Sequence, residues 1–350
     1  MKYLKERGYQ IMEKEKVNVV GVIGAGRIGR LHINNMRNMP NVRLKTVSDP
    51  QADHMKDWFS ESGVENLTKD YKNIIDDPEI NVVFICAPTS LHVQIITEAA
   101  KAGKHIFCEK PICFSDENTC KAHKVVKQAG VKFQLGFNRR FDRNFAKTKE
   151  LVKNKAIGDL HILKIQSRDP EPPSLEYVSH SGGIFMDMSI HDFDMARFIS
   201  GSEVEEVYVV GGALINPEFK QYEDIDTALI TLKFENGLVG VIDNSRQAVY
   251  GYDQQLEAFG SKGSAKVNNE KESSVEVLLK EGVKSSNPLH FFLERYNDAF
   301  IEEVEQFFEA INNDEEVPCG FVDGIMAQRI ASAAKESLLT GLPIKVEKYQ

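Results

Sequence analysis

Residues 181–198, with the sequence SGGIFMDMSIHDFDMARF, place three ionisable side chains at a helical spacing. Asp187, His191 and Asp194 occupy positions i, i+4 and i+7, which share one face of an α-helix. Histidine titrates near neutral pH, and a carboxylate one turn away can fix the tautomer of its ring. The pair is therefore suited to moving a proton between the protein and a bound substrate.

Two other interpretations of this segment remain open. Carboxylates and imidazoles are also zinc ligands, but three ligands on one helix face would span about 10 Å, which is awkward for a single ion. We therefore expect no metal. Acid–histidine pairs four residues apart also occur on ordinary water-exposed helices, so the segment alone does not establish a catalytic site.

A second group of residues is suited to binding a dinucleotide. The run from Val17 to Ile23 has the β-branched composition of a strand buried on both faces, and Gly24, Gly26 and Gly29 follow it in the GxGxxG spacing. In this motif the first glycine allows a tight turn, the second lets the backbone approach a pyrophosphate, and the third lets helix pack on strand. The helix N-terminus supplies free N–H groups to the anion.

An acid in the right place extends the dinucleotide motif. Asp49 ends the next strand-like run, at the distance of about 20 residues where a carboxylate accepts hydrogen bonds from the adenine ribose. The extra phosphate of NADP would meet that carboxylate as a like charge, at a cost of about 4 kcal/mol at a separation of about 4 Å. Pro50 and Gln51 bring no arginine to offset this, so the sequence predicts NAD as the cofactor.

Strand and helix patterns alternate through the first half of the chain. Strand runs at 81–88, 105–111 and 132–137 are separated by helical patterns at 90–102 and 115–129. Such alternation predicts a parallel, doubly wound Rossmann sheet whose ligands bind at the carboxyl ends of the strands. Polar residues at those ends are expected to gather around one crevice: Thr89, His92, Glu109, Lys110, Asn138, Arg139 and Arg140.

The pattern changes after about residue 150. Runs at 160–169, 204–215, 226–234, 238–248, 255–260 and 274–281 read as strands joined by short turns, which indicates mainly antiparallel pairing. We expect an α/β chain with an N-terminal extension (1–16), a Rossmann domain (17–137) and an α+β domain with an open sheet (138–350). The far face of that sheet is expected to be covered by another subunit or by helices at 291–312 and 323–339.

The composition and net charge argue against several classes of protein. The chain has 350 residues and a net charge of −9, which argues against a nucleic-acid or anionic-membrane binder. No apolar run reaches the roughly 18 residues of a membrane span, and the charged start does not resemble a secretion signal. Five cysteines without a CxxC pattern favour reduced thiols in the cytoplasm. We further hypothesise that the first eleven residues are dispensable.

Four motifs together carry a family resemblance. The stretches AGRIG, APTSLH, CEKP and GGIFMDMSIHDFDMARF resemble the glucose-fructose oxidoreductase / inositol dehydrogenase / MocA (Gfo/Idh/MocA) family, and FNRRFD and AVYGYDQ look most like its inositol 2-dehydrogenase branch. The resemblance implies a nicotinamide dehydrogenase that assembles into dimers and tetramers through the open sheet. It also implies that Lys110, Asp187 and His191 form the catalytic set, with Arg140 and Tyr250 holding a polyol.

Motif and resemblance together give two sets of expected contacts. The expected cofactor-binding residues are Gly24, Gly26, Arg27, Ile28, Gly29, Asp49, Ala87, Pro88, Thr89, His92, Glu109 and Lys110. The expected substrate-binding residues are Lys110, Asn138, Arg140, Asp187, His191 and Tyr250.

The expected reaction is the oxidation of a secondary alcohol. NAD takes only a hydride, so the protein must take the proton. We favour His191 as the base, with Asp187 orienting it and Lys110 stabilising alkoxide character, although the sequence does not decide which of His191 and Lys110 takes the proton first. The expected activity is myo-inositol to scyllo-inosose in a cytoplasmic homotetramer. Another cyclic polyol or aldose (scyllo-inositol, glucose) and a non-catalytic NAD(H)-binding regulator remain alternatives.

Overall fold

The computed structural model describes residues 16–349, so the expected extension at 1–16 falls almost entirely outside it. The first half of the chain forms a six-stranded sheet in the order β3-β2-β1-β4-β5-β6, with every neighbouring pair parallel. This confirms the doubly wound fold. The strands are β1 (Asn18–Ile23), β2 (Val42–Ser48), β3 (Asn66–Thr68), β4 (Val82–Ile85), β5 (His105–Cys108) and β6 (Phe133–Leu135).

Helices follow these strands as the alternation predicts. They are α1 (Arg27–Met36), α2 (Lys56–Ser62), α3 (Lys72–Ile75), α4 (Thr89–Lys101) and α5 (Asp116–Ala129). The sequence pattern did not indicate β3, α2 or α3, which are short. The capping of α5 is local chemistry: the hydroxyl of Ser115 accepts a hydrogen bond from the backbone N–H of Asn118, and Gly130 ends the helix in a left-handed conformation.

The second half forms a seven-stranded sheet in the order β12-β11-β7-β10-β9-β8-β15. Most pairs are antiparallel, but β7 and β10 run parallel. The strands are β7 (Leu160–Arg168), β8 (Val204–Gly212), β9 (Thr227–Phe234), β10 (Val239–Ser245), β11 (Asp253–Gly260), β12 (Gly263–Val267) and β15 (Ile344–Lys345).

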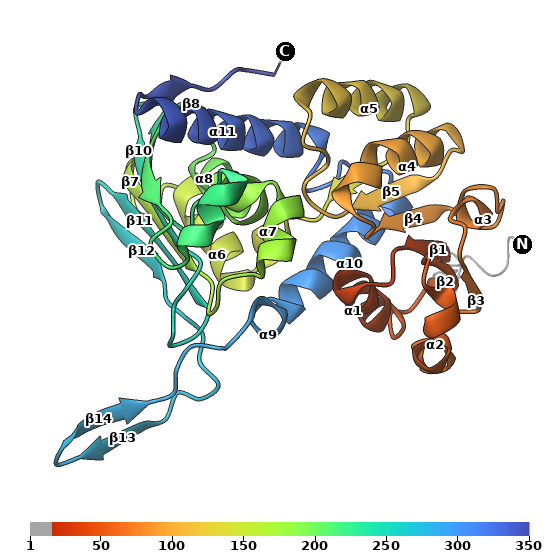
Figure 1. Cartoon of the computed structure of the whole chain (residues 1–350), viewed down its shortest axis with the longest axis horizontal. Coiled ribbons are helices and arrows are strands. Elements are labelled where there is room, and N and C mark those ends of the chain that lie inside the picture. The colour runs from red at the N-terminus through yellow and green to blue at the C-terminus, as the bar shows by residue number, and fades with distance from the viewer. Residues whose placement is uncertain (1–15, 350) are drawn as a thin grey trace, which may run out of the picture.

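One face of this sheet is covered and the other is open. The covering helices are α6 (Arg143–Lys153), α8 (Ile190–Ser200) and α11 (Phe321–Thr340), as Figure 1 shows. Burial alternates along β9, where Ala228, Ile230 and Leu232 are buried and Leu229 is 54% exposed. Of the two helices expected to cover the sheet, only the one at 323–339, which is α11, does so, and the outer face stays exposed within the described chain.

Helix α10 (Asn297–Asn313) crosses back to the first sheet. Its side chains Val304, Phe307 and Phe308 pack into one core with Val20 and Phe84 of the parallel strands. Residues 138–350 were expected to form a separate domain, but this helix completes the core of the first one.

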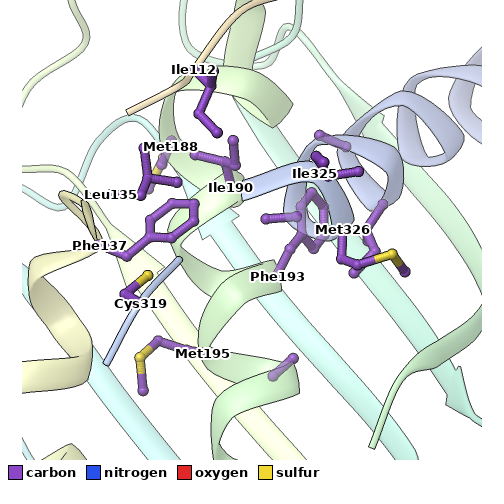
Figure 2. Close-up of a cluster of buried hydrophobic side chains, with 14 of the residues drawn as sticks. Ile112, Leu135, Phe137, Met188, Ile190, Phe193, Met195, Cys319, Ile325 and Met326 are labelled. Carbon is purple, nitrogen blue, oxygen red and sulfur yellow. The ribbon is translucent and has the colours of Figure 1, made fainter. Parts of the chain in front are cut away.

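A shared apolar core joins the two halves (Figure 2). Phe137 comes from the nucleotide half, Met188 and Phe193 from the segment of the acid–histidine motif, and Ile325 from α11, and all are buried. These contacts explain why apolar residues stand between the acids and the histidine in residues 181–198, since the apolar side chains fill this core.

A two-stranded arm projects from the body at the lower left of Figure 1. It consists of β13 (Glu276–Leu279) and β14 (Gly282–Ser285), whose residues are all exposed. The run at 274–281 is thus a strand of a separate hairpin rather than of the main sheet. Short α7 (Leu175–Ser181) and α9 (Phe292–Arg295) complete the fold.

Candidate active site

Lys110 and Asp187 meet across the boundary between the two halves. Strand β5 ends at Cys108, so Lys110 leaves the carboxyl end of the parallel sheet, where such folds bind ligands. Its Nζ donates a hydrogen bond of 2.8 Å to the backbone oxygen of Asp187 and lies 3.4 Å from Oδ1 of the same residue. The structure therefore brings two of the three expected catalytic residues into contact.

The segment that carries Asp187 is not a regular α-helix. Residues Phe185–Ser189 form a π-helical turn that leads into α8, and π-turns of this kind are frequent at functional sites. The carboxylate of Asp187 accepts a hydrogen bond of 2.8 Å from the hydroxyl of Tyr177 and forms an ion pair of 2.9 Å with Arg246. Asp187 was expected to orient His191, but it bonds Lys110, Tyr177 and Arg246 instead.

These contacts set the charge of Asp187. Burial alone would raise the pKa of its carboxyl group, but Lys110 and Arg246 outweigh burial, and the pKa lies below its ordinary value. Asp187 is therefore an anion at neutral pH that balances two cations in an enclosed site.

His191 stays neutral at neutral pH. Burial lowers the pKa of its ring well below the ordinary value, and the positive charges of Lys110 and Arg139 lower it further. The ring meets Phe137 edge-on at 5.8 Å between centroids, and its Nδ1 is buried without a hydrogen-bond partner in the described chain. Its Nε2 is therefore the nitrogen that remains for a ligand.

Two residues that the sequence left without a role lie beside this cluster. Arg246 forms ion pairs with Asp187 and, at 3.2 Å, with Asp169, and burial raises the pKa of Asp169. Asp169 and Arg246 come directly after Arg168 and Ser245, which face each other at the ends of the parallel pair β7 and β10. No local pattern in the sequence indicates that parallel pairing, so the contact between the two residues was not predicted.

Arg140 does not reach the cluster. Its guanidinium bonds both carboxylate oxygens of Asp194 at 2.6 and 2.8 Å, and also bonds Asp323 and the backbone oxygen of Pro318. It was expected to hold the substrate, but these internal acceptors engage four of its five N–H donors. Asp194 turns to Arg140 and away from the other two motif residues, so the motif does not form the three-ligand zinc face considered above.

The other expected substrate contacts have different positions. The hydroxyl of Tyr250 bonds Asp253 and Arg168 rather than the Lys110 cluster, so it lies outside that cluster. Asn138 is buried in the short 3-10 turn after β6. Arg139 pairs with the buried Asp192 at 2.6 Å.

The glycine loop has the shape that a bound dinucleotide requires. Gly24 has φ +97°, and a Cβ there would lie 2.5 Å from the backbone oxygen of Cys86. A Cβ on Gly29 would lie 1.9 Å from the oxygen of Gly24, so helix and turn fit only without side chains. A Cβ on Gly26 would meet open space. Gly26 is the N-cap residue of α1 and has no side chain to bond the N–H groups of the first turn. The first N–H groups of a helix have no acceptor within the helix itself, so those of α1 are suited to bind a pyrophosphate.

Asp49 is placed beside that loop. Its two carboxylate oxygens accept hydrogen bonds from the backbone N–H groups of Ala25, at 2.9 Å, and Gln51, at 2.8 Å. Each oxygen keeps a lone pair that could accept a bond from a ribose hydroxyl. The first turn of α1 contains Arg27, Ile28 and Gly29, as the motif requires.

Two expected cofactor contacts have internal partners. The ring nitrogens of His92 lie 2.9 and 2.8 Å from the backbone oxygens of Pro111 and Ala87, and the side chain is 1% exposed. His92 therefore braces the loop of Ala87, Pro88 and Thr89 instead of touching a ligand. The carboxylate of Glu109 bonds the ring of His32 at 2.8 Å.

No helix in the described part of the chain has the length and apolar character to span a bilayer. All five cysteines are free thiols.

Known proteins share both halves of this fold. A family model for the NAD-binding Rossmann fold of an oxidoreductase family matches residues 19–137, and one for a GFO/IDH/MocA C-terminal domain matches residues 145–266. The uncharacterised oxidoreductase YrbE of Bacillus subtilis is 55% identical over 94% of this chain and 96% of its own length. A myo-inositol 2-dehydrogenase of Thermotoga maritima is 45% identical over 94% of this chain and 98% of its own. The crystal structure of a scyllo-inositol dehydrogenase from Lactobacillus casei with NAD(H) and scyllo-inositol has a TM-score of 0.89 and 30% identity, and the match covers 95% of this chain and 99% of that one.

Proposed function

This chain belongs to the Gfo/Idh/MocA family of NAD-dependent oxidoreductases, and we propose that it oxidises myo-inositol to scyllo-inosose. The observation that supports the proposal is the contact of Lys110 with Asp187 at the carboxyl end of β5, where the charge of Lys110 also helps to lower the pKa of His191. An alcohol dehydrogenase needs such a pair of groups, one to receive a proton and one to stabilise the oxygen that loses it.

Each residue of the cluster has a distinct part in the proposed reaction. Bound NAD supplies the hydride acceptor and takes no proton. His191 accepts the hydroxyl proton on the ring nitrogen that carries no hydrogen, since its lowered pKa keeps the ring neutral at neutral pH. Lys110 donates a hydrogen bond to the same oxygen. Its ammonium group has three N–H donors, and the bonds to Asp187 leave at least one of them for the substrate.

Asp187 holds Lys110 rather than His191. Its carboxylate and backbone oxygens both face the ammonium group, while Tyr177 and Arg246 fix the carboxylate from the other side. In this scheme Asp187 positions the group that stabilises the alkoxide. The order of proton transfers follows from the charge states, because a neutral imidazole accepts a proton and an ammonium group cannot.

A polyhydroxylated ring suits the polar groups around this cluster. Tyr177, Asp169 and Arg246 offer a hydroxyl, a carboxyl and a guanidinium within one network, and vicinal hydroxyl groups can both donate to and accept from them. The proposed substrate contacts are thus Lys110 and His191 at the reacting hydroxyl and this network at its neighbours. The names of the Thermotoga and Lactobacillus relatives support an inositol as the ring.

A panel of polyols tests the proposal. The purified protein is mixed with NAD and with myo-inositol, scyllo-inositol or glucose, and the reduced cofactor is followed by its absorbance. We expect the largest kcat/KM with myo-inositol. A preference for scyllo-inositol or glucose would replace the proposed substrate, and NAD binding without turnover of any polyol would favour a regulator on the same fold.

We also propose that the chain forms a homotetramer. The outer face of the second sheet exposes Val210, Leu229, Val239 and Phe259, and the arm exposes Leu278, which is an unusual amount of apolar surface for strands in water. A second copy of the chain would cover these side chains. Light scattering during gel filtration measures the mass directly. The free thiols support a cytoplasmic location.

A further inference from the structure

A buried cluster of three titratable groups lies directly behind Lys110. It contains His32 from α1, Glu109 from the end of β5 and Glu303 from α10, and one ligand atom of each lies within 4.8 Å of the others. His32 and Glu303 are 0% exposed. The proposed reaction uses none of the three, although Glu109 precedes Lys110 in the chain.

The position of the proton on His32 follows from its surroundings. Its Nε2 lies 2.8 Å from Oε1 of Glu109, while its Nδ1 is buried without a hydrogen-bond partner in the described chain. The rings of Phe84, Phe107 and Phe300 surround it at 5.0 to 5.8 Å between centroids. Of the two ring nitrogens only Nε2 has an acceptor, so the N–H that His32 donates to Glu109 is the one on Nε2.

No described residue donates a hydrogen bond to the side-chain carboxyl group of Glu303. Both of its oxygens are buried, and neither has a hydrogen-bond donor among the described residues. A carboxylate anion in such a place would leave its charge unbalanced beside the carboxylate of Glu109. A carboxylic acid, in contrast, has an O–H that Glu109 can accept.

We propose that Glu303 is a neutral carboxylic acid that donates a hydrogen bond to Glu109 and thereby anchors the end of β5 that positions Lys110. Glu109 is then held by His32 from α1 and by Glu303 from α10, so two helices fix the backbone from which the ammonium group extends. Glu303 acts through Glu109 and is a positioning residue.

The groups that face Glu303 agree with a neutral acid. Burial raises the pKa of its carboxyl group well above the ordinary value, and the charge of Glu109 raises it further. The other titratable groups around Glu303 are His32 and the thiols of Cys86 and Cys319. Burial raises the pKa of both thiols. No cation in the described chain faces this carboxyl group at ion-pair distance.

A metal ion is the competing occupant of the cluster. Structural zinc takes four ligands, whereas three protein groups converge here inside an aromatic cage. The separation of 2.8 Å between His32 and Glu109 is that of a direct N–H···O bond. The geometry therefore favours a shared proton.

The test compares Glu303→Gln with Glu303→Met. The amide of glutamine can donate to Glu109 without a charge, so Glu303→Gln should keep kcat within about threefold of the wild type. Methionine fills the space without a donor, and Glu303→Met should lower kcat about tenfold or more while the Kd of NAD changes less than about threefold. Glu305→Met is the matched control, because Glu305 is exposed on the same helix, and it should behave as the wild type.

Two further measurements do not depend on the reaction. The infrared spectrum of the wild type should contain the carbonyl band of a buried protonated carboxyl group that Glu303→Gln lacks. Because the folded-state pKa is raised, the proton on Glu303 stabilises the fold at low pH, and this stability is lost as pH rises through that pKa. The melting temperature of the wild type should therefore fall relative to that of Glu303→Gln as pH rises above about 4.5, the ordinary pKa of a glutamate carboxyl group.

The outcomes separate this inference from the proposed function. An absent carbonyl band, a stoichiometric metal ion in the purified protein, or equal damage in Glu303→Gln and Glu303→Met would overturn the neutral acid. An inactive wild type that shows the band and the pH-dependent melting would overturn the proposed reaction and leave the protonation state of Glu303 standing.

Discussion

Replacing Asp187 with asparagine tests the charge balance of the active site. The substitution keeps the shape of the side chain and its acceptor for Tyr177, but removes the negative charge between Lys110 and Arg246. At an effective dielectric constant of about 20, unit charges at 3.4 and 2.9 Å attract the carboxylate by roughly 5 and 6 kcal/mol. Desolvation offsets much of this attraction, and breaking a buried pair costs about 3–5 kcal/mol of folding free energy.

The kinetic effect of Asp187→Asn should be larger than its structural effect. Without the carboxylate charge, Lys110 keeps only neutral acceptors on residue 187, the backbone oxygen and the side-chain amide oxygen, so its Nζ is held less firmly in place to stabilise the alkoxide. We expect kcat to fall about a hundredfold or more, while NAD binding changes little. Steady-state oxidation of myo-inositol gives kcat, and cofactor fluorescence on titration gives the Kd of NAD(H).

A matched control separates chemistry from stability. Asp194 lies on the same helical segment and is also buried against an arginine, but its partner is Arg140 rather than Lys110. Asp194→Asn should lose a similar amount of folding free energy and keep kcat within about threefold. The reasoning fails if Asp187→Asn turns over like the wild type, or if Asp194→Asn loses as much activity.

Four more outcomes can be measured on the same protein. Lys110→Ala and His191→Ala should each reduce turnover by roughly 10²–10⁴ with nearly unchanged NAD binding, and wild-type turnover in both would remove the mechanism. Because the pKa of His191 is lowered, kcat/KM should fall with acid only below about pH 6.5, as the ring gains its proton; a fall that begins at higher pH would contradict a neutral His191. Asp49→Ala should weaken NAD and relax discrimination against NADP, and an unchanged ratio of the two kcat/KM values would show that the ribose contact lies elsewhere. Leu229→Lys places a charge on the open sheet face and should reduce the mass seen by light scattering, whereas an unchanged tetramer would place the interface on another surface.

The nucleotide half was predictable because its signals are local. The positive φ of Gly24 and the close contact of Gly29 with Gly24 arise within a few residues of the chain, and buried parallel strands have the sequence of continuous β-branched runs. The parallel direction of the strands follows from their alternation with helices, and the six-stranded sheet confirms it. The short elements β3 and α3 were not predicted, because so few residues do not establish a recognisable sequence pattern.

The site was harder to predict because its partners are distant in sequence. Helical spacing paired Asp187 with His191, but the π-turn and the approach of Lys110 and Arg246 gave the carboxylate other partners. The contact of Arg246 with Asp187 was not predicted, because no pattern in the neighbouring sequence shows that β7 and β10 run parallel. The family pattern suggested Arg140 as a substrate contact by position, while its burial against Asp194 depends on the tertiary packing of α11 and α8.

The return of α10 to the first sheet limits how this protein can be recombined. A fragment ending at residue 137 would contain every strand of the parallel sheet, yet it would leave the apolar surface around Val20 and Phe84 without Val304 and Phe307. Domain exchange aimed at a new cofactor preference must therefore transplant two separate stretches of the gene. Point substitutions at Asp49 and its neighbours are a simpler route to a new cofactor preference, since they leave the packing of α10 on the first sheet unchanged.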